Sequence, residues 1–161
     1  MNIMRCLLLT SLACGAGAGL AETPPPTPTD ASTQAIWVNL GGISWHDDRR
    51  KDYNENNGGL GLEYPLQADI ALMGGAFHNS VHKTSGYVAI KWQPFTLSDW
   101  KLGLSTGVMN GYPGIQRGGV FLAALPMASY EGSRFGVNLA LVPYVDRAEG
   151  ALAIQFKFRL R

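Results

Sequence analysis

The chain has 161 residues, of which 20 are glycine and only 16% are charged, whereas an ordinary globular domain has about 25% charged residues and about 7% glycine. This composition argues against an ordinary soluble enzyme. The formal net charge is +1, so no excess of positive charge is available to hold nucleic acid by its phosphates, and we expect no nucleic-acid partner. Both cysteines, Cys6 and Cys14, lie close to the N-terminus, which leaves the rest of the chain without a disulfide or a reactive thiol.

The N-terminal segment has the pattern of an export signal. Arg5 precedes an apolar stretch, Cys6 to Leu20, that is too short and too rich in glycine for a membrane-spanning helix, and small residues precede Glu22, where a signal peptidase would cleave. We therefore interpret residues 1–21 as a signal peptide. The alternative interpretation takes residues 11–14, Ser-Leu-Ala-Cys, as a lipoprotein box, although such boxes usually open with an aliphatic residue.

A proline-rich segment follows. Residues 23–29 contain four prolines, which cannot donate backbone hydrogen bonds and favour an extended polyproline form. We predict a tether over residues 22–33.

The remainder of the chain, residues 34–161, is predicted to be all β. Stretches of about ten residues, alternating or continuously apolar, are separated by polar breaks that carry glycine or proline, which is typical of strands. Eight strands are predicted, over residues 35–46, 58–66, 70–79, 86–95, 100–109, 118–130, 135–144 and 150–160. Their lengths suit tilted strands that cross a bilayer, and bacterial outer-membrane barrels have even strand numbers from eight upward. We therefore expect an eight-stranded antiparallel up-and-down barrel in the outer membrane.

The connections alternate in length. Residues 67–69, 96–99 and 131–134 are short turns, which such barrels place on the periplasmic side, whereas the charged segment 47–57 is predicted to be a long outer loop. A soluble barrel of the lipocalin type also alternates along its strands and stays as an alternative. Against it stand aromatic residues near the predicted strand ends, as in the girdles of membrane barrels; these are Trp45, Tyr64, Trp92, Trp100, Tyr130 and Tyr144.

Three histidines remain outside the signal peptide. His46 closes the first predicted strand, and His78 and His82 flank the end of the third. In an up-and-down barrel these two strand ends lie at the same rim, so we expect His46 and Ser80 to meet there. Three histidines without clustered carboxylates do not favour a zinc site, and we expect no metal or other cofactor.

Several short motifs occur in one order along the chain: Ile43-Ser44-Trp45-His46, Asp52-Tyr53-Asn54-Glu55, Gly58-Gly59-Leu60-Gly61-Leu62, Ala76-Phe77-His78-Asn79-Ser80, Lys101-Leu102-Gly103-Leu104, Leu125-Pro126-Met127-Ala128-Ser129 and Val142-Pro143. Together they resemble the PagP family of lipid A palmitoyltransferases. The resemblance implies an outer-membrane enzyme that moves a palmitoyl chain from the sn-1 position of a phospholipid donor to a hydroxyl of a lipid A acceptor. We expect it to act as a monomer.

The resemblance also implies roles for particular residues. The family's histidine falls on His46 and its serine on Ser80, whereas Asn79 stands where the family has an aspartate. Acyl transfer needs a base near neutral pH and a donor to the oxyanion, which an imidazole and a hydroxyl supply. Ser80 is interpreted as the oxyanion donor and, as the weaker alternative, as a nucleophile. The family's two prolines that admit lipid from the side fall on Pro126 and Pro143. A proline within a strand has no N–H to donate, so a hydrogen bond to the neighbouring strand is missing there.

Two other functions stay open. Asn79 cannot support an imidazolium as a carboxylate does, which favours a non-catalytic barrel related to PagP. His78 and Ser80, two residues apart on a strand, would share one face and resemble the His-x-Ser motif of lipid A deacylases, although that family carries the motif nearer its C-terminus.

Overall fold

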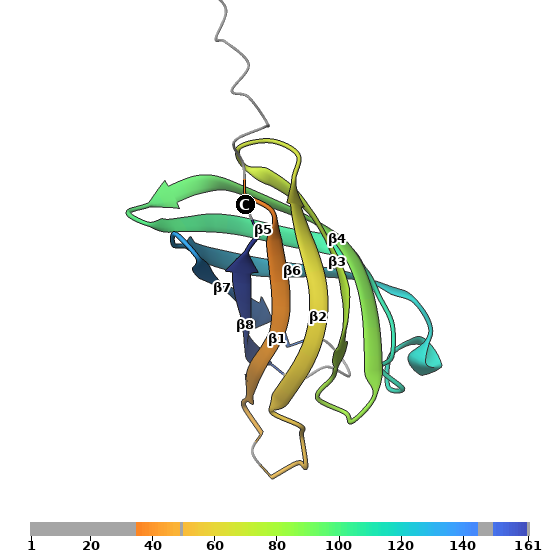
Figure 1. Cartoon of the computed structure of the whole chain (residues 1–161). Coiled ribbons are helices and arrows are strands. Elements are labelled where there is room, and N and C mark those ends of the chain that lie inside the picture. Colours follow the sequence, from red (N-terminus) through yellow and green to blue (C-terminus); the bar gives the residue numbers. More distant parts are fainter. Residues whose placement is uncertain (1–34, 49, 145–149, 161) are drawn as a thin grey trace, which may run out of the picture.

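A computed structural model describes residues 35–48, 50–144 and 150–160 of the chain. The predicted signal peptide and the whole of the predicted tether lie outside these residues. The described residues form a closed barrel in which each strand pairs antiparallel with its neighbours in sequence and the last strand pairs with the first (Figure 1). Its strands are β1 (Trp37–His46), β2 (Asn56–Pro65), β3 (Ile70–His78), β4 (Thr84–Leu97), β5 (Trp100–Met109), β6 (Phe121–Glu131), β7 (Phe135–Val142) and β8 (Ala151–Arg159). The prediction of an eight-stranded up-and-down barrel is confirmed.

Every strand except β5 differs from the prediction at one or both ends, by one to three residues. The fourth strand was expected to end at residue 95 but runs to Leu97, because Thr96 and Leu97 pair with Lys101 and Trp100 across a tight turn. The sixth was expected to begin at residue 118, but β6 begins at Phe121. The residues before it form η2 (Gln116–Gly118), a 3-10 turn in which Gly118 has a φ of 86°, so the chain there is not extended.

The connections divide the barrel into two ends. Short turns join β2 to β3, β4 to β5 and β6 to β7 at the short-turn end, which is at the top and upper left of Figure 1. Residues 47–48, 50–55, 79–83 and 110–120 lie at the long-loop end, where the β1–β2 connection is seen at the bottom of Figure 1. The alternation of connection lengths is therefore as predicted.

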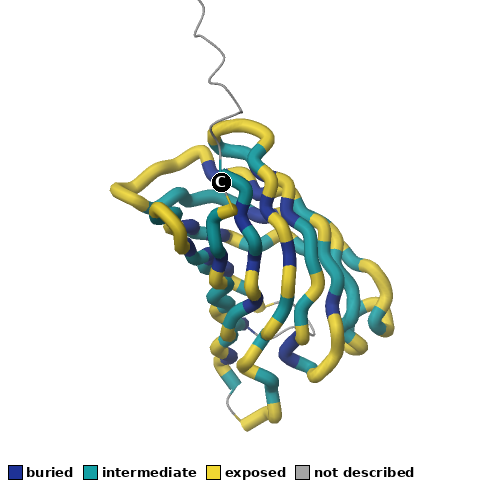
Figure 2. Tube along the Cα trace, viewed as in Figure 1, coloured by how far each residue is buried: buried dark blue, intermediate teal, exposed yellow. Residues whose placement is uncertain are grey.

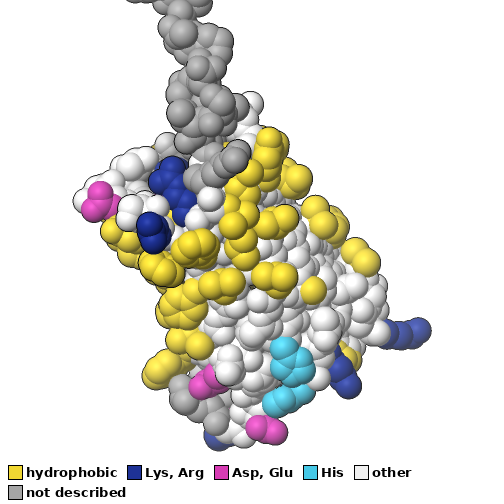
Figure 3. Space-filling model, viewed as in Figure 1, with side chains coloured by type: hydrophobic (Ala, Val, Ile, Leu, Met, Phe, Trp, Pro, Cys, Tyr) yellow, Lys and Arg dark blue, Asp and Glu magenta, His cyan; other side chains and the backbone are white. Residues whose placement is uncertain are grey.

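The barrel has its polar residues inside and its large apolar residues outside. Strand residues alternate between the two faces, and the dark and light bands along the tube in Figure 2 follow this alternation. The buried polar side chains include Asn39, Glu63, Ser85, Lys91, Gln93, Ser105, Ser129, Asn138 and Lys157. The exposed apolar ones include Leu40, Trp45, Leu60, Leu62, Tyr64, Trp92, Phe95, Leu122, Phe135 and Phe156. Figure 3 shows apolar side chains as a belt on the visible face.

The barrel interior also holds a small apolar cluster. Met73, Met127 and Ala140 are buried together, and Tyr87, Leu125 and Ala153 pack against them. These residues come from β3, β4, β6, β7 and β8, so the cluster joins facing walls of the barrel. It separates a charged half of the interior, toward the short turns, from an uncharged half toward the long loops.

Candidate functional site

A bulge in β1 directs His46 into the barrel. The register of β1 with both neighbouring strands shifts just after Asn39, and Gly41 has a φ of 81°, which favours glycine. Before the bulge the odd-numbered Trp37 and Asn39 face inward and are buried; after it the even-numbered His46 is buried and Trp45 is exposed. One inserted residue reverses the faces of a strand, so without the bulge His46 would face outward.

His46 lies beneath the first long loop. Its side chain is only 6% exposed, and its ring stacks on that of Tyr53 with 4.3 Å between centroids and 23° between planes. The backbone N–H of the next residue, Asp47, donates to the carbonyl of Gly150 at the start of β8 (3.2 Å). The imidazole is therefore held between its strand and the loop that follows it.

Ser80 lies at the same rim, in the connection between β3 and β4. It is 9% exposed, and its carbonyl accepts a hydrogen bond from the backbone N–H of Asn54 (2.9 Å). Since Asn54 follows Tyr53, one short piece of the first loop contacts both His46 and Ser80. The structure thus brings these two residues to one rim, with Tyr53 and Asn54 linking them.

Tyr112 lies in the connection between β5 and β6, at the same end of the barrel. Burial raises the pKa of Tyr112 above its usual value. Tyr112 therefore stays a neutral phenol, able to donate or accept a hydrogen bond, at physiological pH.

Asn79 is fully buried and holds the long-loop end together. Its side-chain oxygen accepts from the backbone N–H groups of Val81 (3.1 Å) and Lys83 (2.9 Å). Its side-chain nitrogen donates to the hydroxyl of Ser85 (2.9 Å) and to the carbonyl of Gly111 (2.8 Å). An amide has two donor hydrogens and two acceptor positions, so this side chain is fully used in shaping the loops.

The expectation that His78 and Ser80 share one face is wrong. His78 is the last residue of β3 and is exposed, whereas Ser80 lies beyond the strand end and is buried; the alternation of a strand does not continue into a turn. His82 has a φ of 57°, and its Nε2 lies 3.3 Å from the carbonyl oxygen of Asp52. Among the described residues no group of three or more His, Cys, Asp or Glu could hold a metal ion.

Pro126 marks the end of a ladder. The pairing of β6 with β7 runs only from Met127 with Ala140 to Glu131 with Gly136, whereas the pairing of β6 with β5 continues to Phe121. Within the described part of the chain, residues 121–126 are therefore paired on one side only. Pro143 follows the end of β7 directly and is exposed, so one predicted access proline lies on β6 and the other just beyond β7, the two strands that separate here.

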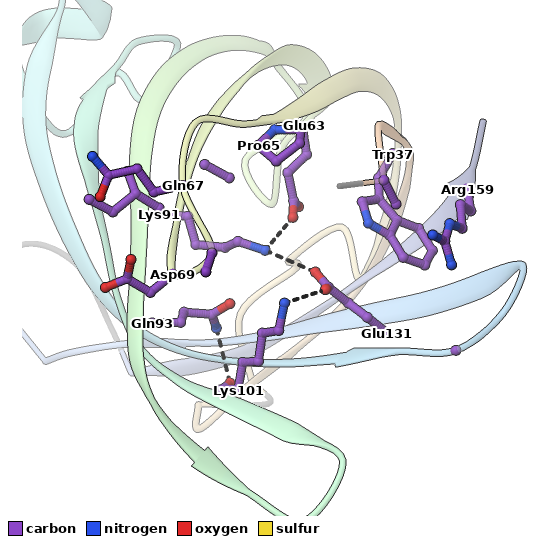
Figure 4. Close-up of a pocket in the computed structure, with 15 residues that line it drawn as sticks. Trp37, Glu63, Pro65, Gln67, Asp69, Lys91, Gln93, Lys101, Glu131 and Arg159 are labelled. Carbon is purple, nitrogen blue, oxygen red and sulfur yellow. Dashed lines mark hydrogen bonds and ion pairs between the residues drawn. The ribbon is translucent and has the colours of Figure 1, made fainter. Parts of the chain in front are cut away.

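The interior near the short turns contains a network of buried charges that the sequence did not reveal as a unit. Lys157 contacts Glu63 (3.0 Å) and Glu131 (2.7 Å); Lys91 contacts Glu63, and Lys101 contacts Glu131 (2.8 Å). Figure 4 shows this group, except Lys157, around a cavity of about 350 Å³ at the short-turn end. The network lies away from His46, and it lines this cavity with paired charges.

The half of the barrel toward the long loops, in contrast, has no charged residues in its strands. Its strand residues include no Asp, Glu, Lys or Arg; they are residues 42–46, 56–60, 75–78, 84–88, 105–109, 121–125, 140–142 and 151–155. Many of the inward positions hold Gly or Ala. A cavity of about 10 Å³ lies between Phe77 and Tyr87 here.

Three residues of the rim were not identified from the sequence. Tyr53 and Tyr112 lie in loops whose conformations no periodic pattern predicts. Ser44 shares the inward face of β1 with His46, and its hydroxyl oxygen is buried without a hydrogen-bond partner in the described part of the chain. Because Ser44 is two residues from His46, the sequence indicates that both side chains lie on one face of the strand. Only the bulge shows that this face is the inner one.

Comparison with protein-family models and with curated proteins finds no match to this chain. The assignment of a function therefore depends on the residues and their geometry. Among the described residues, no helix is long and apolar enough to cross a membrane.

Proposed function

We propose that this protein is an exported outer-membrane barrel that transfers an acyl chain from a phospholipid to a hydroxyl of lipid A, as the PagP family does. The membrane location is supported by the inverted distribution of side chains, with Lys157 and Glu63 buried inside and Trp45 and Leu122 exposed outside. A soluble barrel would expose the charges and bury the aromatic residues, whereas lipid-facing strands require the reverse.

In this proposal His46 is the general base. Its imidazole takes the proton from the acceptor hydroxyl as the oxygen of that hydroxyl attacks the ester carbonyl carbon of the donor. The carbonyl oxygen becomes negative and accepts a hydrogen bond from the hydroxyl of Ser80. When the tetrahedral intermediate collapses, the ester bond to the donor breaks, and the leaving lysophospholipid oxygen takes the proton back from His46.

One observation carries the proposal: the barrel is uncharged in the half beneath His46 and Ser80, and beside that half β6 pairs with β5 but not with β7, from Phe121 to Pro126. An acyl chain is compatible only with an interior that holds no unpaired charge. A strand edge without a ladder is the place where a lipid could enter from the side. Pro126 maintains such an edge because it lacks the N–H that a ladder bond needs.

A non-catalytic barrel is the second candidate, and two observations favour it. The side chain of Asn79 makes its hydrogen bonds to the loops, which suits a structural role. The cavity between Phe77 and Tyr87 in the uncharged half, about 10 Å³, is too small for an acyl chain. The deacylase is not supported, because His78 and Ser80 do not share a face.

Expression in a Gram-negative strain that lacks its own palmitoyltransferase tests the proposal. Mass spectra of lipid A should show a fraction with one additional acyl chain, and His46→Ala should abolish that fraction. His78→Ala is the matched control, since His78 is exposed at the same rim, and it should leave the fraction unchanged. Unmodified lipid A with the wild-type barrel correctly assembled would leave the non-catalytic candidate.

A further inference from the structure

We propose that the cavity at the short-turn end of the barrel binds a small anion that carries one negative charge and a hydroxyl group. The ligand contacts the ammonium group of Lys101 and the side-chain oxygen of Gln93, which both line this cavity. The site lies at the opposite end of the barrel from His46, and the inference does not depend on the proposed acyltransferase function.

The first step is the balance of charge around the cavity. The charged side chains that line it, together with Lys157, are four cations and three carboxylates; they are Lys91, Lys101, Lys157 and Arg159, and Glu63, Asp69 and Glu131. Lys91, Lys157 and Glu63 are each less than 5% exposed, so water cannot stabilise an excess charge there as it does at a surface. Among the described residues one positive charge is left over, and a ligand with one negative charge completes the balance.

The second step is that the buried glutamates are shared among the lysines. Glu63 accepts hydrogen bonds from Lys91 and Lys157 (3.0 Å to the latter). Glu131 accepts from the same two lysines, at 3.4 and 2.7 Å, and from Lys101 at 2.8 Å. Three ammonium groups thus depend on two carboxylates, and a further acceptor oxygen in the cavity would relieve the deficit of negative charge.

Lys101 is the lysine that can reach a ligand. Its side chain is 40% exposed, whereas the side chains of Lys91 and Lys157 are 5% and 0% exposed. Among the carboxylates of the described residues, its ammonium group contacts only Glu131. An ammonium group has three donor hydrogens, so Lys101 can still donate to a negatively charged oxygen in the cavity.

Gln93 supplies an acceptor beside Lys101. It is only 3% exposed, and its side-chain nitrogen donates to the carbonyl of Lys101 (3.1 Å) and to that of Met127 (3.3 Å). Its side-chain oxygen is buried and has no hydrogen-bond partner in the described part of the chain. Figure 4 shows the nitrogen directed to the carbonyl of Lys101 and the oxygen on the side of the Lys101 ammonium group. Because a buried acceptor without a partner is unfavourable, this oxygen selects a ligand that brings a donor.

These two contacts define the chemical class of the ligand. A negatively charged oxygen accepts from Lys101, and a hydroxyl group of the same molecule donates to Gln93. A hydroxycarboxylate and a singly charged phosphate both carry this pair of groups. The cavity of about 350 Å³ has room for either together with water, since one water molecule needs about 10–15 Å³.

Thermal unfolding of the full barrel in detergent tests the proposal, at about pH 6 and at constant ionic strength. A ligand that binds only the folded protein raises the midpoint of unfolding as its concentration rises above its Kd. Glycolate, or phosphate, which is mainly a singly charged ion at this pH, should raise the midpoint above its value in chloride. A response to both supports the shared chemistry, and a response to one alone assigns the site to hydroxycarboxylates or to phosphates. No response to either would overturn the proposal.

Two comparisons connect the response to Lys101 and Gln93. Lys101→Met should abolish the shift in midpoint, whereas Lys83→Met, which removes an equal charge from an exposed position at the long-loop end, should retain it. Acetate and sulfate lack a hydroxyl group and should bind about threefold to tenfold more weakly than glycolate and phosphate, as expected for the loss of one hydrogen bond. An equal shift in Lys101→Met and wild type, or equal affinities with and without the hydroxyl group, would refute the inference.

Discussion

The ring of Tyr53 lies on the imidazole of His46, with 4.3 Å between the ring centroids. This stack joins the first long loop to the last residue of β1, and it covers the side chain proposed as the base. His46 is largely buried, so the strength of the stack should influence the accessibility of the imidazole.

We predict that Tyr53→Ala makes His46 several-fold more reactive. The stack contributes about 0.5–1.5 kcal/mol, which corresponds to a factor of about 2 to 13 in the population of an exposed imidazole. The rate of histidine modification by diethylpyrocarbonate, followed at His46 by peptide mass spectrometry, measures the effect. Tyr64→Ala, on the exposed face of β2, should leave that rate unchanged, and an equal rate in wild type and Tyr53→Ala would show that the loop does not cover the site.

We predict that Gly41→Ala is destabilising by about 1–2 kcal/mol or more, because its φ of 81° is strained for any residue with a Cβ. A Cβ there would also collide with the backbone of Gly59 on β2. Since the bulge directs His46 inward, acyl transfer should fall as well. Gly58→Ala is the matched control, because a Cβ at Gly58 meets nothing within 4 Å. Unfolding in urea from lipid vesicles measures the difference, and equal stability of the two variants would contradict the role of the bulge.

Lys157→Met should destabilise the barrel by about 3–5 kcal/mol. The ammonium group is fully buried between Glu63 and Glu131, and its removal leaves two carboxylates with less positive charge around them. Lys101→Met should cost less than about 1 kcal/mol, because Lys101 is 40% exposed and contacts only Glu131 among the carboxylates of the network. Addition of Glu131→Gln to Lys157→Met should recover part of the loss. Similar midpoints of thermal unfolding for the two single variants would argue against the network.

The raised pKa of Tyr112 predicts a loss of stability at alkaline pH. The unfolded tyrosine ionises near pH 10, but the folded one keeps its proton to higher pH. Between these two pKa values the folded state binds more protons, so its stability falls as the pH rises through this window and is fully present below it. The difference in unfolding free energy between wild type and Tyr112→Phe isolates this contribution from other groups. It should shrink from pH 9 to pH 12, and a constant difference would contradict the burial of the phenol.

Pro126→Ala should reduce the entry of lipid. Alanine supplies an N–H, and this allows the ladder between β6 and β7 to extend beyond its present limit at Met127 and Ala140. The acylated fraction of lipid A should fall while heat-modifiable migration shows a correctly assembled barrel. Pro113→Ala, in the loop that carries Tyr112 and outside the strands, tests whether loss of any proline at this end has the same effect. Unchanged acylation in Pro126→Ala would show that lipid does not enter between β6 and β7.

The amino-acid sequence by itself determined the strands, their number and their order. Residues of opposite character alternate over stretches such as Phe156 to Leu160, where Lys157 is buried and Phe156 and Leu160 are exposed. Each stretch is bounded by residues that break a strand, so the pattern is local and can be read from neighbours in the chain. The same locality allowed the two ends of the barrel to be predicted from the lengths of the connections.

The tertiary structure alone decided what the site residues do. Strict alternation from the buried Trp37 would turn Trp45 inward and His46 outward, and only the bulge after Asn39, set by pairing with β2 and β8, reverses this. Asn79 and Ser80 have partners in other loops, at Gly111 and Asn54, about thirty residues away along the chain. Such contacts depend on closure of the barrel, which brings distant loops together, and no pattern within one strand contains that information.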